Sequence, residues 1–392
     1  MNMQVSRRLE RFSSAMFFEL NQLKQQLRAN GTEVIDLGIG SPDLPPPPHV
    51  IEALTEAVCD PSVYGYPTSE GSPFFRQAVA DWYKKRFDVE LDPSTECMAL
   101  MGSQDGLSHL SLTLVDPGDY VLVPDPGYPI YEVSIHLADG RPYLMPLLET
   151  NDFLPDFSKI PPEVAQRAKY MILNYPNNPV TAVAERSFYE QAVSFAKLYD
   201  ILIVSDIAYS ELAFDGFKPI SILQIDGAKD VAVEFHSLSK SFNMAGCRIG
   251  YAAGNREALQ ALAVVKSNID YGVFTAVQKA GAAALTGDPS HTAHMSETYR
   301  KRRDVLLDGL KRIGWDIPKP QATMFVWAKI PIPMTSRKFT KELLAQTGVA
   351  VVPGVGFGEQ GEGYVRIALV QPEEKLQEVV ARIEKSGILK KN

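Results

Sequence analysis

Residues 231–240 read VAVEFHSLSK, a mostly apolar run that leads directly into two serines and a lysine, Lys240. Three further apolar runs precede it in the chain, at 120–123, 170–173 and 201–204. The runs lack strict alternation of apolar and polar residues, and segments long enough for helices separate them. This pattern is typical of strands that are buried on both faces of a mainly parallel sheet. We therefore predict a large α/β domain built around these strands.

Polar residues follow three of these runs at the point where each strand should end. They are an amide, Asn178, then a carboxylate and a phenol, Asp206 and Tyr209, and finally a hydroxyl and an amine, Ser237 and Lys240. In open α/β sheets, ligands bind beyond the carboxyl ends of the strands. We therefore expect these side chains to lie at one ligand site.

Lys240 suits the role of an amine nucleophile. It stands at a strand end beside hydroxyls and faces a carboxylate, and the role requires that its surroundings lower its pKa from the ordinary value of about 10.4. An isolated lysine in a loop is more often simply solvated. The combination of groups favours the nucleophile, and such an amine forms Schiff bases with carbonyl compounds.

Composition excludes several classes of protein. The chain has 392 residues, of which 45% are hydrophobic and 22% charged, as is typical of a globular fold. A net charge of −8 without a basic tract argues against nucleic acid as a partner. Cys59, Cys97 and Cys247 form no CxxC pair, so we expect a reducing cytoplasm and neither disulfides nor zinc. Arg7 and Arg8 precede an amphipathic stretch, so no export signal is expected.

The sequence pattern changes after about residue 287. The C-terminal part contains helix and strand patterns in turn, at 297–312, 324–330, 339–346, 349–352, 364–369 and 372–387. At the other end, Leu20, Leu23 and Leu27 recur at helical spacing. We predict an N-terminal helix and segment (1–45) that joins a small α+β domain (288–392), and a large ligand-binding domain (46–287).

Seven short stretches together resemble one family, the pyridoxal-phosphate-dependent aminotransferases of fold type I, class I/II. In the order of the chain they are LGIGSPD (37–43), YPTSEG (66–71), NYPNNP (174–179), SDIAY (205–209), SLSK (237–240), AGCRIG (245–250) and YVRI (364–367). Each stretch alone is weak evidence, but seven in the family's order, nearly end to end, make coincidence remote. The resemblance implies a mainly parallel seven-stranded sheet in the large domain, with a smaller α+β domain beside it.

The resemblance also implies the catalytic residues. Lys240 would hold the cofactor as a Schiff base and then carry the proton between the substrate α-carbon and the cofactor C4′. Asp206 would pair with the pyridine nitrogen and keep it protonated, although a helix N-cap is the alternative role for this residue. Tyr209 and Asn178 would hydrogen-bond the phenolic oxygen, whereas a core aromatic is the alternative for Tyr209.

Further residues would bind the cofactor's phosphate and ring. Ser103 and Gln104 begin a helix-like stretch, whose N-terminal amides can bind an anion. Ser237 adds a hydroxyl and Arg248 a bidentate guanidinium. Tyr128 matches the aromatic residue that stacks on the pyridine ring, with packing in a turn as the alternative.

One cofactor contact would come from a second subunit. In the family, the tyrosine that matches Tyr66 reaches the phosphate of the neighbouring chain. The resemblance therefore implies a homodimer whose sites are shared between subunits.

Substrate would bind at the C-terminal strand. The family uses the position of Arg366 to hold the substrate α-carboxylate, while a structural ion pair is the alternative role. Gly40 would let substrate approach the N-terminal segment closely. One departure concerns the Asn-Asn-Pro motif, which commonly continues with Thr-Gly but here continues with Val180-Thr181. The missing glycine is expected to alter the turn.

Two other patterns carry no function in this interpretation. His291 and His294 stand three residues apart, but no carboxylate or thiol pattern accompanies them, so no metal site is expected. The run GVGFG at 354–358 lacks the Gly-Lys-Ser/Thr of a phosphate loop, and we interpret it as a connection in the small domain.

The expected reaction is transfer of an amino group from an L-amino acid to a 2-oxo acid such as 2-oxoglutarate, as in amino-acid biosynthesis. Residues 241–246 and 266–274 look most like the LL-diaminopimelate aminotransferase group. Related chains act on methionine, alanine or aspartate, and a C-S lyase on the same scaffold would share Lys240, Asp206 and Arg366. A non-enzymatic regulator usually carries an added DNA-binding domain, for which 392 residues leave no room.

Overall fold

The larger sheet of the protein has seven strands. A computed structural model describes residues 6, 8, 9 and 15–390, so Arg7 and parts of the predicted segment 1–45 lie outside the described residues. The strand order is β2-β8-β7-β6-β5-β3-β4, and only β8 runs antiparallel to its neighbours. This confirms the mainly parallel seven-stranded sheet. The strands are β2 (Cys97–Leu100), β3 (Tyr120–Asp125), β4 (Arg141–Pro146), β5 (Ala168–Asn174), β6 (Leu202–Asp206), β7 (Ala232–Ser237) and β8 (Gly250–Gly254).

The strands extend one to two residues beyond the apolar runs at their carboxyl ends. Asn174 pairs with Asp206 in the register of β5 and β6, and Asp206 pairs with Phe235 of β7. Ser237 ends β7 opposite Gly250. Because these polar residues belong to the sheet itself, its backbone hydrogen bonds fix where their side chains begin.

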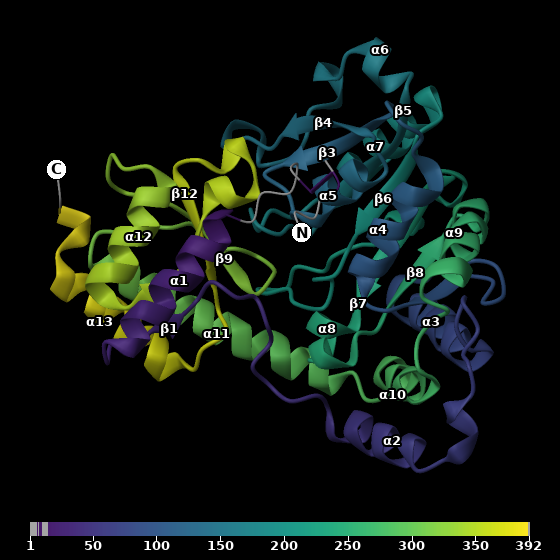
Figure 1. Cartoon of the computed structure of the whole chain (residues 1–392), viewed down its shortest axis with the longest axis horizontal. Helices are drawn as coiled ribbons and strands as arrows, with labels where there is room; N and C mark the ends of the chain where they lie inside the picture. The colour runs from purple at the N-terminus through teal and green to yellow at the C-terminus, as the bar shows by residue number, and fades with distance from the viewer. Residues whose placement is uncertain (1–5, 7, 10–14, 391–392) are drawn as a thin grey trace, which may run out of the picture.

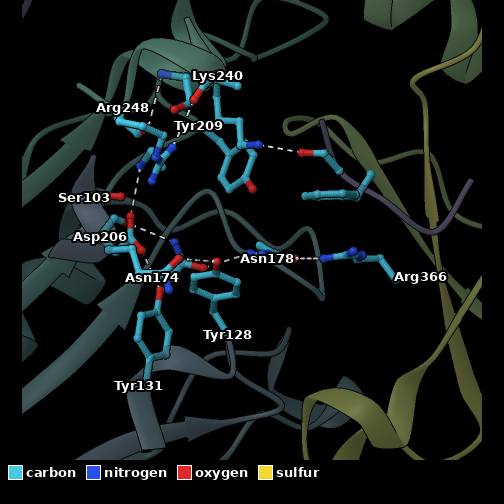
Figure 2. A pocket seen from close by; sticks show the side chains of 17 residues that line it. Ser103, Tyr128, Tyr131, Asn174, Asn178, Asp206, Tyr209, Lys240, Arg248 and Arg366 are labelled. Carbon is cyan, nitrogen blue, oxygen red and sulfur yellow. Dashed lines mark hydrogen bonds between the residues drawn. The ribbon is translucent and has the colours of Figure 1, made fainter. Parts of the chain in front are cut away.

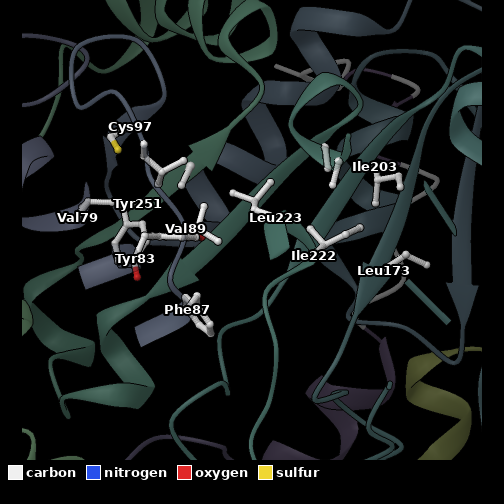
Figure 3. Close-up of a cluster of buried hydrophobic side chains, with 14 of the residues drawn as sticks. Val79, Tyr83, Phe87, Val89, Cys97, Leu173, Ile203, Ile222, Leu223 and Tyr251 are labelled. Atoms are coloured by element: carbon white, nitrogen blue, oxygen red, sulfur yellow. The ribbon is translucent and has the colours of Figure 1, made fainter. Parts of the chain in front are cut away.

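Both faces of this sheet are buried. Neighbouring residues of one strand, such as Ile172 and Leu173, belong to separate hydrophobic clusters because side chains alternate between faces. One cluster packs against α3, α7 and α10, and part of it appears in Figure 3, where Tyr83 of α3 lies beside Tyr251. The opposite cluster packs against α4, α5 and α9. These helices are α3 (Pro73–Phe87), α4 (Ser103–Leu114), α5 (Ile130–Leu137), α7 (Arg186–Tyr199), α9 (Arg256–Ile269) and α10 (Thr275–Thr286).

A smaller sheet occupies the other end of the molecule (Figure 1). Its order is β11-β12-β9, all antiparallel, and its core includes Phe339 and Leu376 from the helices around it and Trp315 from the loop after α11. The elements are β9 (Phe325–Lys329), β11 (Val352–Pro353), β12 (Tyr364–Ala368), α11 (Ser290–Arg312), α12 (Ser336–Thr347) and α13 (Glu373–Ser386). Every element predicted for this part is present, although the stretch 349–352 is divided between β10 (Val349–Ala350) and β11.

The N-terminal segment packs on this smaller part. β1 (Ile35–Asp36) pairs with β10, and α1 (Ala15–Ala29) places Leu20 in a cluster with Leu344 of α12. The division of the chain into domains, with boundaries at 45 and 287, stays a prediction. The remaining helices are α2 (Pro48–Val58), α6 (Pro162–Ala165) and α8 (Leu238–Ser241). Within the described residues, no helix has the length and apolar character needed to span a membrane.

A buried ionic group joins α4 to α9. Lys266 is fully buried, and its Nζ lies 2.6 Å from Asp105 Oδ2 and 3.0 Å from Asp270 Oδ2. His109 Nδ1 lies 2.7 Å from the other oxygen of Asp105. Asp105, His109 and Asp270 have the geometry to hold a metal ion, but the ammonium of Lys266 already supplies a cation to both carboxylates. The group fixes the first turn of α4, where Asp105 also accepts the N–H of Met101 at 2.9 Å.

We expect Lys266→Met to lower the free energy of unfolding by about 3–5 kcal/mol, because two partly buried carboxylates would lose their buried cation. Urea denaturation at equilibrium measures the loss. Lys84→Met is the matched control, since Lys84 is about half-exposed and pairs with Asp88 and Glu90 at the surface; it should cost less than about 1 kcal/mol. Equal costs for the two variants would contradict this account.

Candidate active site

A cavity of about 250 Å³ lies where the carboxyl ends of β5, β6 and β7 face the smaller sheet. Figure 2 shows Lys240 and Arg248 on one side of it and Arg366 on the opposite side. Every predicted site residue except Tyr66 lines this cavity. The lining residues are Gly40, Ser103, Gln104, Tyr128, Tyr131, Asn174, Asn178, Asp206, Ala208, Tyr209, Ser237, Ser239, Lys240, Ala245, Arg248, Phe325 and Arg366.

Lys240 reaches the cavity from a short helix that begins directly after β7. The Ser237 hydroxyl caps α8 by accepting the N–H of Ser239 at 3.2 Å, so the turn that carries Lys240 is fixed to the strand end. Lys240 Nζ donates to the carbonyl of Gly40 at 2.5 Å. Burial, together with the positive charges of Arg366 and Arg248, lowers the pKa of Lys240 to about 8. A substantial neutral fraction near that pH makes this amine a nucleophile and a base.

Asp206 ends β6 and is 5% exposed. Its Oδ2 accepts the hydroxyl of Tyr131 at 2.7 Å, and its Oδ1 accepts the N–H of Ala208 at 3.2 Å. Burial raises the pKa of Asp206, and those two hydrogen bonds act in the opposite direction. Among the described residues, no lysine or arginine forms a salt bridge with this carboxylate. It can therefore accept a cationic group from a ligand.

Positive charge and hydroxyls surround the start of α4. Gly102 has φ +79°, and a Cβ there would lie 2.7 Å from Nη2 of Arg248, so glycine lets the guanidinium approach the helix terminus. The first turn of a helix leaves N–H groups without intrahelical partners. With the hydroxyls of Ser103 and Ser237, these donors form a site suited to a phosphate.

Aromatic and amide groups occupy the centre of the cavity wall. The Tyr128 hydroxyl donates to Gln104 Oε1 at 3.2 Å. Tyr209 packs edge-on against Phe325, and burial raises the pKa of its hydroxyl. Asn178 is 6% exposed and receives a hydrogen bond from Arg366. Tyr128, Tyr209 and Asn178 thus present groups that could contact a planar ligand.

Arg366 enters from β12 and is 7% exposed. It donates to Asn178 Oδ1 at 2.7 Å and to the carbonyl of Gly38 at 2.9 Å, and in the part of the chain that the structure describes its Nε has no hydrogen-bond partner. Phe325 and Phe357 lie over the guanidinium, with ring centroids 4.2 and 4.6 Å from Cζ. Burial lowers the pKa of Arg366 to about 10. Among the described residues its hydrogen-bond acceptors are neutral, and it forms no ion pair there.

A glycine is required at position 40 because the backbone there lies too close to an aromatic ring for a side chain. A Cβ at this position would lie 2.4 Å from Cζ of Phe325. The carbonyl of Gly40 accepts from Lys240, so the N-terminal segment contacts Lys240 as well as Arg366.

The turn after the Asn-Asn-Pro motif has the positive φ that favours glycine, although no glycine stands there. Thr181 adopts φ +60°, a conformation that costs a β-branched residue about 1–2 kcal/mol. Asn178 nevertheless reaches Arg366. The departure from the family's pattern therefore strains the backbone at Thr181 rather than displacing the amide.

Tyr66 does not reach the cavity of its own chain. It is 92% exposed, and its ring contacts that of Tyr271. Tyr64 and Phe274, which contact each other, are exposed as well.

Sequence reasoning assigned no role to several residues of the site, and four of these contact its functional side chains. Tyr131 stands three positions after Tyr128, and Asn174 lies within the quoted NYPNNP stretch. Phe325 falls in an apolar strand, which indicates core packing equally well. The run 354–358 lies in the smaller part and is more than a connection, because it places Phe357 over Arg366. His291 and His294 lie in the first turns of α11 and do not line the cavity.

The groups around the cavity fit pyridoxal phosphate. Hydroxyls, a helix N-terminus and a guanidinium match its phosphate, a buried carboxylate with no described cation matches its ring nitrogen, and an amine of lowered pKa matches its aldehyde. A fold type I sheet with this site defines a pyridoxal-phosphate-dependent aminotransferase.

Comparison with known proteins places the chain in a family. The model of aminotransferase class I and II matches residues 32–383, and the chain belongs to that family. It is 47% identical to the LL-diaminopimelate aminotransferase of Moorella thermoacetica over 383 residues, 98% of each chain. Substrate-bound BacF from Bacillus subtilis has a TM-score of 0.94 and 42% identity, covering 98% of both chains. A probable N-succinyldiaminopimelate aminotransferase from Thermus thermophilus has a TM-score of 0.89 and 40% identity, covering 95% of this chain and 100% of that one.

We expect the amine of Lys240 in the cofactor-free protein to react with trinitrobenzenesulfonate with a midpoint near pH 8, because the pKa of Lys240 is lowered to about 8. Below the midpoint the ammonium does not react, and above it the amine does. Peptide mass spectrometry measures the extent at each pH, with the exposed Lys385 as an internal reference. Arg366→Met should move the midpoint upward, since it removes one of the positive charges that lower it. A midpoint equal to that of Lys385 would contradict the burial argument.

Proposed function

We propose that this aminotransferase moves the amino group of LL-diaminopimelate to 2-oxoglutarate. The assignment of the amino donor rests on 47% identity, over 98% of both chains, to a protein named for that substrate. The structural neighbour named for N-succinyldiaminopimelate would act on the same carbon chain with one amine blocked. Both names describe long dicarboxylic amino acids, which need a carboxylate anchor at the reacting end. Arg366 supplies that anchor.

Lys240 and Asp206 would carry the catalytic roles. When bound, pyridoxal phosphate supplies an aldehyde that accepts amines and a ring that withdraws electrons from the substrate α-carbon. Lys240 provides the amine that holds this aldehyde and the base that moves the α-proton. Its lowered pKa suits both tasks, because a neutral amine is needed for each. Asp206 keeps the ring nitrogen positively charged through its buried carboxylate.

The remaining residues would orient the cofactor. Gln104 joins Ser103, Ser237 and Arg248 in holding the phosphate at the start of α4, where the helix dipole also favours an anion. Tyr128 would lie against the ring. Tyr209 and Asn178 would donate to the phenolic oxygen.

Arg366 and Asn178 would hold the substrate's α-carboxylate, with Gly40 leaving space beside them. The two phenylalanine rings fix the plane of the guanidinium, and its neutral partners can give way to a carboxylate. A bidentate pair with a charged acceptor is stronger than either neutral hydrogen bond. Binding at this end would bring the substrate α-carbon toward Lys240, which contacts the same N-terminal segment.

We expect LL-diaminopimelate to discharge the visible absorption of the cofactor-loaded protein, and 2-oxoglutarate to restore it. Glutamate, aspartate, alanine, methionine, N-succinyl-LL-diaminopimelate and cystathionine are added singly to separate samples without a keto acid. Lys240→Ala should lack the absorption band of the lysine-bound cofactor. Discharge by one of these compounds, but not by LL-diaminopimelate, would replace the proposed substrate. Pyruvate release from cystathionine with a persisting band would indicate a C-S lyase.

We also propose a cytoplasmic homodimer that serves amino-acid biosynthesis. The three cysteines are free thiols, which suits a reducing compartment. Tyr66, Tyr64, Tyr271 and Phe274 are exposed aromatic residues, the composition that favours a subunit interface. In such a dimer Tyr66 would reach the phosphate site of the other subunit.

Co-expression of two defective variants tests the shared site. Tyr66→Ala and Lys240→Ala should each have little activity, but their mixed dimer would contain one site with both residues intact. The isolated mixed dimer, with one of its two sites intact, should then have about one half of wild-type activity, and the unseparated random mixture about one quarter. Purification with two different affinity tags isolates the mixed dimer for assay. Activity no higher than that of the Tyr66→Ala variant would mean that Tyr66 does not act across the interface.

A further inference from the structure

Tyr131 lies behind the candidate cofactor site. It belongs to α5, directly beyond Tyr128, and is 1% exposed. Its hydroxyl donates to Asp206 Oδ2 at 2.7 Å, and its ring meets that of Tyr128 edge-on at 5.8 Å. Figure 2 shows Tyr131 below Asp206, while Arg366 lies at the far right of the view. Tyr131 therefore contacts both the carboxylate and the aromatic ring proposed to bind the cofactor ring.

The hydroxyl of Tyr131 provides the shortest hydrogen bond to Asp206. The second is the longer N–H contact from Ala208 at 3.2 Å. Burial raises the pKa of Asp206, which favours its protonated form, and the hydrogen bond from Tyr131 is the largest influence in the opposite direction. Removal of this one hydroxyl would leave a buried carboxylate with one weak donor among the described residues.

We propose that Tyr131 is a positioning residue that keeps Asp206 ionised and directed toward the ring nitrogen of the cofactor. This inference rests on the proposed function. The carboxylate and the ring nitrogen compete for one proton. A hydrogen bond to the carboxylate stabilises its ionised form, so the proton stays on the nitrogen and the ring keeps its positive charge.

A tyrosine is chemically suited to this position. Burial raises the pKa of Tyr131 well above its ordinary range, so its hydroxyl remains a neutral donor. An arginine or lysine there would neutralise Asp206 and weaken its hold on a cationic ring nitrogen. A neutral donor stabilises the carboxylate and leaves its charge available to the ligand.

A matched control lies in the same hydrophobic cluster. Tyr170 of β5 is also 1% exposed, and its hydroxyl is 2.6 Å from Ser111 Oγ. It does not line the cavity. Tyr170→Phe therefore removes one buried hydroxyl from the same core without touching Asp206.

The test compares wild type, Tyr131→Phe and Tyr170→Phe, each loaded with ¹⁵N-labelled pyridoxal phosphate. The ¹⁵N chemical shift of the ring nitrogen reports its protonation directly. We expect the protonated position in wild type and Tyr170→Phe, and a move toward the unprotonated position in Tyr131→Phe. The kcat of Tyr131→Phe should fall about 10- to 100-fold, the range for loss of a hydrogen bond to a charged group. Loading with N-methylated pyridoxal phosphate, whose nitrogen cannot lose its charge, should restore most of that loss.

An unchanged shift in Tyr131→Phe would overturn the inference, whatever happens to kcat. So would a loss of kcat equal to that in Tyr170→Phe, or one that the N-methylated cofactor fails to restore. Failure of wild type itself to bind pyridoxal phosphate would overturn the proposed function instead, before any variant is compared.

Discussion

The register of three parallel strands determines the site. Asn174, Asp206 and Ser237 end β5, β6 and β7 at one edge of the sheet, and backbone pairing fixes Asn174 opposite Asp206. Asn174 Nδ2 reinforces that pairing by donating to the carbonyl of Asp206 at 2.8 Å. A slip of one residue would turn each of these side chains to the opposite face of the sheet. The two apolar clusters that cover the sheet are therefore what hold the polar residues in place.

Charge at the site is left partly uncompensated. Lys240 and Arg366 are cations whose acceptors are neutral oxygens, and burial lowers the pKa of both. Elsewhere the same fold pairs its buried cations with acids, as at Lys266 with Asp105 and Asp270. Under the proposed function, the contrast separates structural charge from charge that would bind a ligand. A buried group that lacks its counter-ion is destabilising alone, and an anionic ligand supplies the missing partner.

Sequence reasoning located the parts of the site that follow from strand order, and missed those that depend on packing between distant segments. Lys240, Asp206 and Asn178 could be found because each follows an apolar run within a few residues. Tyr131 and Phe325 could not, because a buried aromatic residue on a helix or strand indicates core packing just as well. Tyr66 carried a prediction that a single chain does not test, since its partner group would lie on another subunit.

The N-terminal segment supplies neutral hydrogen-bond acceptors to the cations of the cavity, which leaves these cations able to bind an anion. Gly38 and Gly40 offer backbone carbonyls to Arg366 and Lys240, and these acceptors belong to a segment that packs with the smaller sheet through β1 and β10. A carboxylate side chain in the place of either carbonyl would form a buried ion pair, and an incoming substrate would have to break it. A neutral carbonyl satisfies the donor at lower strength, so exchange for a charged acceptor is favourable. The cations of the site can therefore be hydrogen-bonded in the free protein. These weak hydrogen bonds would not prevent the cations from binding a substrate carboxylate.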